Sequence, residues 1–267
     1  MKNNAKKEPH QVHDSELLRK PRRLYGDGLT KERMLRSLVC SDAPEQALRH
    51  CGFVVIAGVD EVGRGALCGP VVAAAVILPE EMAFMAAKGL RDSKQLTREQ
   101  REDLDLEIRA IAVDASIAAV DAETIDRVNI YQASRMAMHQ AVDGLTVRPD
   151  HLLIDAMRLS HPCAQTKLIY GDSLSLSIAA ASVIAKVYRD AMMRGFAEEH
   201  PLYGFESHKG YATPEHRRAL QMYGPTPLHR RSFAPVAAVD PEAALERKLK
   251  AAEVLWEEMY NEVPEGA

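Results

Sequence analysis

Short apolar runs and amphipathic segments alternate through the middle of the chain. Runs at residues 53–59 and 71–78 are rich in valine and alanine, and a turn with three glycines separates them. Apolar runs of this length between turn residues are typical of buried strands, and the short connection predicts that the two strands are neighbours. Further strands are predicted at residues 116–120, 151–154 and 167–170.

Helices are predicted where capping residues precede periodic apolar positions. Thr97 and Gln100 have the spacing of a capping box, and Asn129 is placed to cap a second helix. The predicted helices span residues 97–110, 129–142 (with Gly144 just past its end), 176–199, and the segment from Thr213-Pro214 to Gly224. A strand meander followed by alternating strands and helices predicts the α/β class, with one mixed β-sheet flanked by helices.

The N-terminal part of the chain is predicted to lie outside a compact domain that spans residues 51–235. Residues 1–50 form a basic extension that is expected to be partly disordered, with two short helical pieces after residue 30. The second piece has Asp42 as its cap and Pro44 in its first turn. The basic start is compatible with a solvated tail or with an arm that attracts nucleic acid.

Residues 236–267 are predicted to form a C-terminal helical extension. Apolar residues recur there at spacings of 4, 3, 4 and 3, at Leu245, Leu249, Ala252, Trp256 and Met259. This spacing gives one apolar stripe, which we interpret as the face of a helix docked on the body of the protein. A helix that binds a partner is the alternative.

The amino-acid composition and charge exclude some classes of protein. The net charge of −4 gives no global positive field, so a polyanionic partner would need local basic patches. The first 15 residues lack the apolar region of a secretory signal, and the longest apolar run, residues 71–78, is too short to span a bilayer. We therefore expect a cytoplasmic protein without membrane contact, whose widely spaced cysteines are reduced thiols: Cys40, Cys51, Cys68 and Cys163.

Four acids follow predicted buried elements. Asp60 and Glu61 end the first strand, Asp155 ends the fourth, and Asp172 lies between the fifth strand and the long helix. Singly, each is compatible with a cap, a turn or a solvated corner. Together they would repel one another, and a hard divalent cation such as Mg²⁺ or Mn²⁺ would relieve that repulsion. Such carboxylate sites are typical of enzymes that act on phosphates, some of which use two metals about 4 Å apart.

Two further segments have residue types that suit nucleic acid. Gly63-Arg64-Gly65 follows the first two acids, where glycines allow close approach of a ligand and the arginine adds charge. The stretch from His208 to Tyr211 is basic and contains an aromatic residue, which suits phosphate neutralisation and stacking. A tight connection and a solvated face are the alternatives.

The motifs together resemble the ribonuclease HII family, also called type 2 ribonuclease H. The order and spacing agree from about residue 53 to residue 233, in blocks that begin with AGVDEVGRG at Ala57. The other blocks are GPVVAAA at Gly69, DSKQL at Asp92, IDA at Ile154, GDS at Gly171, SIAAASVIAKVYRD at Ser177, YGF at Tyr203 and HKGYAT at His208.

The resemblance implies a ribonuclease H-like fold and an activity. The expected enzyme is a metal-dependent endonuclease that hydrolyses the RNA strand of RNA–DNA hybrids. It is also expected to nick on the 5′ side of single ribonucleotides embedded in duplex DNA, leaving 3′-hydroxyl and 5′-phosphate ends. The implied cofactor is Mn²⁺ or Mg²⁺, and the implied oligomeric state is a monomer.

The resemblance also implies a role for each site residue. The catalytic carboxylates would be Asp60, Glu61, Asp155 and Asp172, of which the first three are the metal ligands. The ribose 2′-hydroxyl would be read by Gly63, Arg64 and Gly65. Lys94 would contact phosphate, and Tyr211 would stack on the deoxyribose that follows. Discrimination between ribose and deoxyribose requires contact with the 2′-hydroxyl, because no other group differs between these two sugars.

Three points stay open at this stage. Asp190 belongs to a family block but lies inside the long helix, so we expect a structural or supporting acid paired with Arg189 or Arg194. Another carboxylate-metal nuclease on the same fold would share the acids without needing the glycines and Tyr211. A hybrid-binding module without catalysis is the non-enzyme alternative, although all four acids are present.

Overall fold

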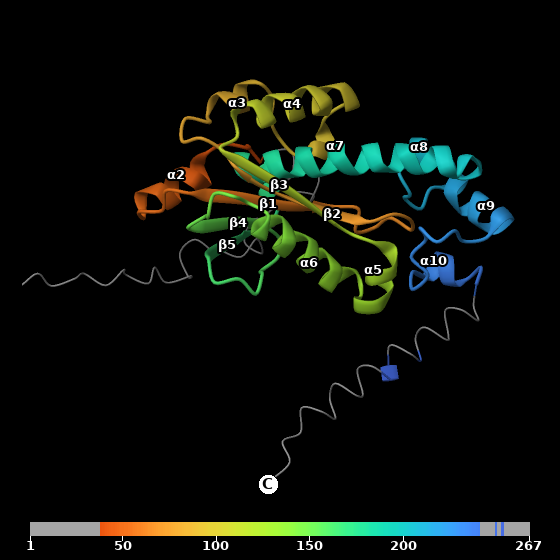
Figure 1. The fold of residues 1–267 in the computed structure, drawn as a ribbon. Helices are drawn as coiled ribbons and strands as arrows, with labels where there is room; N and C mark the ends of the chain where they lie inside the picture. Colours follow the sequence, from red (N-terminus) through yellow and green to blue (C-terminus); the bar gives the residue numbers. More distant parts are fainter. Residues whose placement is uncertain (1–37, 241–248, 250–251, 254–267) are drawn as a thin grey trace, which may run out of the picture. The chain divides into compact units, whose positions relative to one another are not determined.

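The computed structural model describes residues 38–240, 249 and 252–253, which contain a five-stranded mixed sheet (Figure 1). Its strands are β1 (Ile56–Val62), β2 (Val71–Ile77), β3 (Asp114–Val120), β4 (His151–Asp155) and β5 (Ala164–Leu168), in the spatial order β3-β2-β1-β4-β5. The first three strands form an antiparallel meander, whereas β4 pairs in parallel with both β1 and β5. The predicted α/β class with a mixed, helix-flanked sheet is confirmed.

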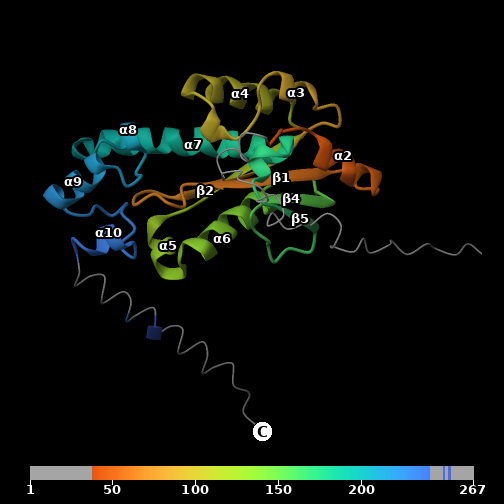
Figure 2. The same cartoon turned by 180° about the vertical axis from the view of Figure 1, so that it is seen from behind.

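Helices cover both faces of the sheet, as Figures 1 and 2 show from opposite sides. The helices are α2 (Ala43–His50), α3 (Phe84–Ala87), α4 (Arg98–Ile111), α5 (Ala122–Val128), α6 (Ile130–Asp143), α7 (Leu176–Glu199), α8 (Phe205–His208), α9 (Pro214–Tyr223) and α10 (Ala234–Ala237). The described residues also form three short 3₁₀ turns, η2 (Ser93–Gln95), η3 (Gly171–Ser173) and η4 (Pro201–Tyr203). One core cluster lies between the sheet and α6, and a second lies between the sheet, α4 and α7.

The long helix α7 lies unusually close to the sheet. Its first half is alanine-rich, as the sequence predicts, and Ala179, Ala180 and Ala181 are fully buried. Opposite them, a Cβ atom at Gly58 would stand only 2.1 Å from the carbonyl carbon of Ser177. The small residues on both sides therefore set the distance between α7 and β1. That distance matters because β1 carries two of the candidate site acids.

Most predicted element boundaries agree with the structure where a capping residue defines them. The capping box of Thr97 and Gln100 is present, and the Asn129 side chain accepts hydrogen bonds from the amides that begin α6. Helix α5, which the sequence analysis missed, is only 7 residues long. Strand β5 lies at Ala164–Leu168 and not at residues 167–170, because its AQTKL sequence has no apolar run to mark it.

Helix α2 joins the compact unit that begins at Val39, although the sequence predicts the domain to begin at residue 51. The reason is Glu45, which is fully buried and accepts hydrogen bonds from Ser175 Oγ (2.6 Å) and Ser177 N–H (2.9 Å) at the start of α7. Asp42 occupies the cap position of α2 but its side chain makes no capping hydrogen bond. The first predicted helical piece, the basic start of the chain and nearly all of the C-terminal helix lie outside the described residues.

No helix in the described part of the chain is long and apolar enough to cross a membrane.

Candidate active site

Asp60 and Glu61 lie inside β1 and not after its end. The strand continues to Val62 because its backbone pairs with β2 at both acids and at Val62 itself. Both carboxylates are therefore enclosed. Asp60 is 4% exposed and the Glu61 side chain 8%, which excludes a solvated corner for these two acids. Since successive side chains alternate between faces, Asp60 shares the α7 face with Gly58, and Glu61 leaves the strand on the opposite side.

The parallel pairing of β4 with β1 brings Asp155 to the same place. Val59 of β1 pairs with Ile154 of β4. Asp60 and Asp155, the next residue in each strand, therefore lie side by side on adjacent strands. Asp172 arrives from the η3 turn that begins immediately before α7, and it is 5% exposed. The structure thus gathers all four predicted acids from three separate segments of the sequence.

Each carboxylate has its own hydrogen-bond donor. The Glu61 amide donates to Asp60 Oδ1 (2.8 Å), and Arg64 Nη1 donates to Glu61 Oε1 (3.3 Å). The Gly171 amide donates to Asp155 Oδ1 (2.7 Å). Lys94 Nζ donates to Asp172 Oδ2 (3.1 Å), so the predicted phosphate-binding lysine stands in an ion pair with a site acid. The Lys94 side chain is nevertheless 76% exposed, which leaves it accessible to a ligand.

The carboxylates disturb one another's protonation. Burial raises the pKa of Asp60 well above its ordinary range, and the charges of Glu61 and Asp155 raise it further. Burial likewise raises the pKa of Glu61 to about 7, against the opposing effect of Arg64. The pKa of Asp155 is raised to about 6 by burial and by Asp172. Keeping these groups ionised together at neutral pH is therefore costly without an added positive charge.

A divalent cation fits this donor set. All four side chains offer oxygen, which hard cations such as Mg²⁺ and Mn²⁺ prefer. Glu61 Oε2 is buried without a hydrogen-bond partner within the described residues, so one acceptor is left for a ligand. In that same part of the chain, no three acidic, histidine or cysteine side chains converge closely enough to hold an ion. Each acid instead accepts a hydrogen bond from its own donor, as described above.

The loop after β1 is held in place by two buried arginines. Gly63 adopts φ +94°, and a Cβ atom there would stand 2.3 Å from Arg189 Nε, so the position requires glycine. Arg189 donates to the carbonyls of Cys68 and Pro70, and Arg230 donates to those of Arg64 and Gly69. A Cβ atom at Gly65 would meet nothing within 4 Å. The backbone at Gly65 therefore faces open space, where a ligand can approach.

Tyr211 lies next to this loop. Its backbone forms a β-bridge with Ala66, and its ring lies 5.9 Å from Lys186 Nζ and 5.5 Å from the Arg189 guanidinium carbon. The residue is neither fully buried nor fully exposed. Tyr211 and the Gly63-Arg64-Gly65 segment thus form one continuous structure, attached to Glu61 through Arg64.

The sequence analysis overlooked several contributors. Asp92, part of the DSKQL block, raises the pKa of Asp172 and stands 3.7 Å from Lys94 Nζ. A hydrogen bond with Ser182 opposes the rise in the pKa of Asp60. Asp190 pairs with Lys186 (2.6 Å) and stands 3.9 Å from Arg101, so the expected pairing with Arg189 or Arg194 is wrong. Lys186 and Arg194 both lie four residues from Asp190, so helical spacing does not choose between them, and Arg194 stands 3.6 Å from Glu102 instead.

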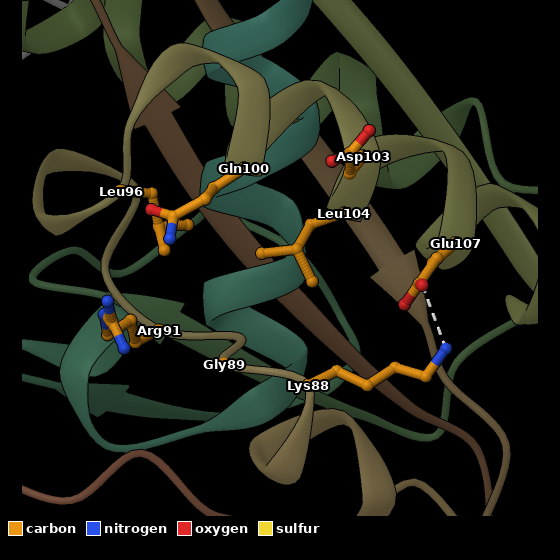
Figure 3. A pocket seen from close by; sticks show the side chains of 8 residues that line it. All are labelled: Lys88, Gly89, Arg91, Leu96, Gln100, Asp103, Leu104 and Glu107. Atoms are coloured by element: carbon orange, nitrogen blue, oxygen red, sulfur yellow. Dashed lines mark ion pairs between the residues drawn. The ribbon is translucent and has the colours of Figure 1, made fainter.

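A pocket of about 290 Å³ between α3, η2 and α4 contains none of these residues (Figure 3). Lys88 and Glu107 form an ion pair across it (2.9 Å). It is separate from the carboxylates and does not contribute to the site.

A mixed five-stranded sheet with four interacting acids defines a carboxylate-metal nuclease of the ribonuclease H-like class. The family model for ribonuclease HII matches residues 57–236, and the chain belongs to that family. It is 55% identical over 221 residues to a ribonuclease HII from Koribacter versatilis, covering 82% of this chain and 86% of the relative. It is 54% identical over 192 residues to one from Bacillus subtilis, covering 72% and 74%.

A solved structure of ribonuclease H2 from Pyrococcus horikoshii has the same fold. It superposes with a TM-score of 0.62 at 25% identity and covers 70% of this chain and 98% of its own. Family membership identifies the protein as a metal-dependent phosphodiester hydrolase, a ribonuclease H-type endonuclease that acts on RNA–DNA hybrids.

Proposed function

We propose that the enzyme also nicks duplex DNA on the 5′ side of a single embedded ribonucleotide, leaving 3′-hydroxyl and 5′-phosphate ends. The observation that carries this proposal is the physical continuity between the acids, the glycine loop and Tyr211. Arg64 contacts Glu61, and Ala66 bridges Tyr211. A group that reads the sugar thus stands at a fixed distance from the group that prepares the phosphodiester for attack.

The glycine loop is suited to recognise a 2′-hydroxyl. Gly63 and Gly65 keep side chains away from the backbone, and the Arg230 clamp on the Arg64 carbonyl holds the loop in one conformation. Backbone amides and carbonyls in a fixed loop can exchange hydrogen bonds with a hydroxyl that deoxyribose lacks. Tyr211 offers a ring face to the next sugar, a contact that needs no base sequence.

The acids are suited to hold the divalent cation, with Asp60, Glu61 and Asp155 as ligands and Asp172 beside them. When bound, the cation supplies an activated water and charge stabilisation at the leaving oxygen. Burial raises the pKa of Asp172, and Lys94 opposes that rise through their ion pair. The Glu61 amide orients Asp60, and the Gly171 amide orients Asp155. We expect either Mg²⁺ or Mn²⁺ to serve.

The decisive experiment uses three substrates: duplex DNA with one ribonucleotide, the same duplex without it, and a uniform RNA–DNA hybrid. Each is incubated with Mg²⁺, Mn²⁺ or EDTA. We expect metal-dependent nicking 5′ of the lone ribonucleotide, an intact all-DNA duplex, and loss of cleavage in Asp155→Asn. Cleavage of the all-DNA duplex would indicate a less selective nuclease, and binding without cleavage by the folded protein would indicate a hybrid-binding module.

Two further properties remain predictions. We expect a monomer, which sedimentation would test, and a cytoplasmic location, which fractionation of the source cells would test.

A further inference from the structure

The loop that follows β1 lies between two other extended segments. On one side, Leu67 N–H donates to Gly210 O (2.8 Å), beside the Ala66–Tyr211 bridge. On the other side, Gly69 N–H donates to Leu228 O (2.9 Å), and a second bridge joins Cys68 to His229. The segment with Tyr211 and the segment with His229 therefore flank the loop and do not pair with each other directly.

A pair of buried histidines links the two flanking segments. His216, from α9, approaches Tyr211 O with Nδ1 (2.9 Å) and His229 Nε2 with its own Nε2 (3.1 Å). On the far side, Thr226 N–H donates to His229 Nδ1 (3.0 Å). The His216 ring thus spans the distance from the Tyr211 backbone to the segment on the opposite side of the loop.

These contacts assign one proton to each ring. Because His229 Nδ1 accepts from an amide, its proton lies on Nε2 and donates to His216 Nε2. That nitrogen is then the acceptor, so His216 carries its proton on Nδ1 and donates it to Tyr211 O. The chain of hydrogen bonds runs in one direction from Thr226 to Tyr211, and it requires both rings to be neutral.

The surroundings keep both rings neutral. His216 is 0% exposed and His229 1%. Burial, with a smaller contribution from the neighbouring His216, lowers the pKa of His229 to about 3. Burial also lowers the pKa of His216, and stacked His208, at 4.4 Å between ring centroids, acts in the same direction. Phe205 packs against both rings at 5.5 and 5.8 Å.

We infer that His216 and His229 are positioning residues that set where Tyr211 stands relative to the Gly63–Gly65 loop. The inference rests on the proposed function, in which the loop reads the ribose and Tyr211 contacts the next sugar. Recognition of a ribose-to-deoxyribose junction needs both contacts at one spacing. The hydrogen bonds through His216 and His229 fix that spacing, and neither histidine contacts the substrate.

Two substitutions at one position separate the link from the packing. His229→Asn keeps an oxygen near Nδ1 to accept from Thr226 but is too short to reach His216. His229→Gln extends an amide toward His216, as Nε2 does, and gives up the Thr226 contact. Phe205→Leu is the matched control, because it disturbs packing around both rings without removing a hydrogen bond of the chain.

The readout is the kcat/KM for the embedded ribonucleotide divided by that for the uniform hybrid. This ratio is insensitive to the fraction of folded protein. We expect it to fall about tenfold in His229→Asn and to stay within about threefold of wild type in His229→Gln. Phe205→Leu should lower Tm and leave the ratio unchanged. Equal ratios for His229→Asn and His229→Gln, or a loss in Phe205→Leu as large as in His229→Asn, would overturn the inference.

A second measurement does not depend on activity. Long-range ¹H–¹⁵N spectra of protein labelled in histidine should show His229 as the Nε2–H tautomer and His216 as the Nδ1–H tautomer, both neutral at pH 6. The opposite tautomers, or a charged ring, would overturn the link. Wild-type enzyme that does not nick at the embedded ribonucleotide would contradict the proposed function, an outcome distinct from the failure of the variants.

Discussion

Glu61→Gln is expected to stabilise the metal-free protein and to inactivate the enzyme. The Glu61 side chain is 8% exposed, and its pKa is raised from an ordinary 4.5 to about 7 by burial. The folded state therefore holds the Glu61 proton more tightly than the unfolded state. Stability from this group is complete below about pH 4.5 and is lost as the pH rises through 7. Glutamine has the same shape and never ionises.

The magnitude follows from the size of the pKa shift. One pKa unit corresponds to about 1.4 kcal/mol, so ionised Glu61 costs about 3 kcal/mol of unfolding free energy at pH 8. At pH 5 the cost falls below about 1 kcal/mol, because the folded state is still protonated there. A saturating cation nearly cancels this difference, since binding at 100 times Kd adds about 2.7 kcal/mol to the wild type.

The assay is urea unfolding at pH 5 and pH 8, in EDTA and in Mn²⁺. We expect Glu61→Gln to exceed the wild type by about 3 kcal/mol at pH 8 in EDTA and to gain less from Mn²⁺. Glu80→Gln, at an exposed position before α3, is the control and should change stability by less than about 0.5 kcal/mol. A Glu61→Gln protein that is no more stable than the wild type at pH 8 in EDTA would refute the reasoning.

Three other predictions concern the site. Because their raised pKa values leave Glu61 mostly and Asp155 partly protonated at pH 6, Mn²⁺ affinity by calorimetry should fall about tenfold from pH 8 to pH 6, and equal affinities would contradict this. Gly65→Ala should leave Tm nearly unchanged while reducing cleavage at a lone ribonucleotide. Gly63→Ala should lower Tm, because Gly63, unlike Gly65, has a positive φ and a crowded Cβ position. Similar losses of Tm in the two variants would contradict this. Arg230→Met should lower the urea-unfolding free energy by about 2–4 kcal/mol, because two loop carbonyls lose their donor in the interior, and a loss under about 0.5 kcal/mol would exclude the clamp.

Capping chemistry explains which elements the sequence predicts well. Helix α7 begins and ends at the predicted residues, and α9 begins at Pro214 and stops before Gly224. Strand ends are harder to predict because backbone pairing decides them. Asp60 interrupts the apolar run of β1, yet its backbone pairs with Ala74 of β2. The sequence therefore locates the acid but not its degree of burial.

The candidate site shows the same difference between features that local sequence predicts and features that long-range contacts decide. The four acids could be found because Asp60, Glu61 and Asp155 come directly after apolar runs in the sequence, and Asp172 shortly precedes the long helix. The clamp on the loop could not be found, since Arg189 and Arg230 contact carbonyls 119 and 161 residues away. No local sequence pattern distinguishes a buried arginine of this kind from an arginine on the solvent-exposed surface. The family block that contains Arg189 indicates its importance without indicating its contacts.

The carboxylates and the glycine loop that follows β1 differ in how their charges and polar groups are neutralised. The acids place several negative charges in a poorly solvated space, and only an external cation can complete their coordination. The loop is complete without a ligand, because buried guanidinium groups donate to its carbonyls in a fixed geometry. That arrangement has its own cost, visible in the pKa of Arg230, which burial lowers to about 9. A lysine would offer a single charged point that deprotonates more readily when buried, so two carbonyls of one loop are better held by arginine. The acids can therefore respond to cation and pH, while the glycine loop keeps its shape.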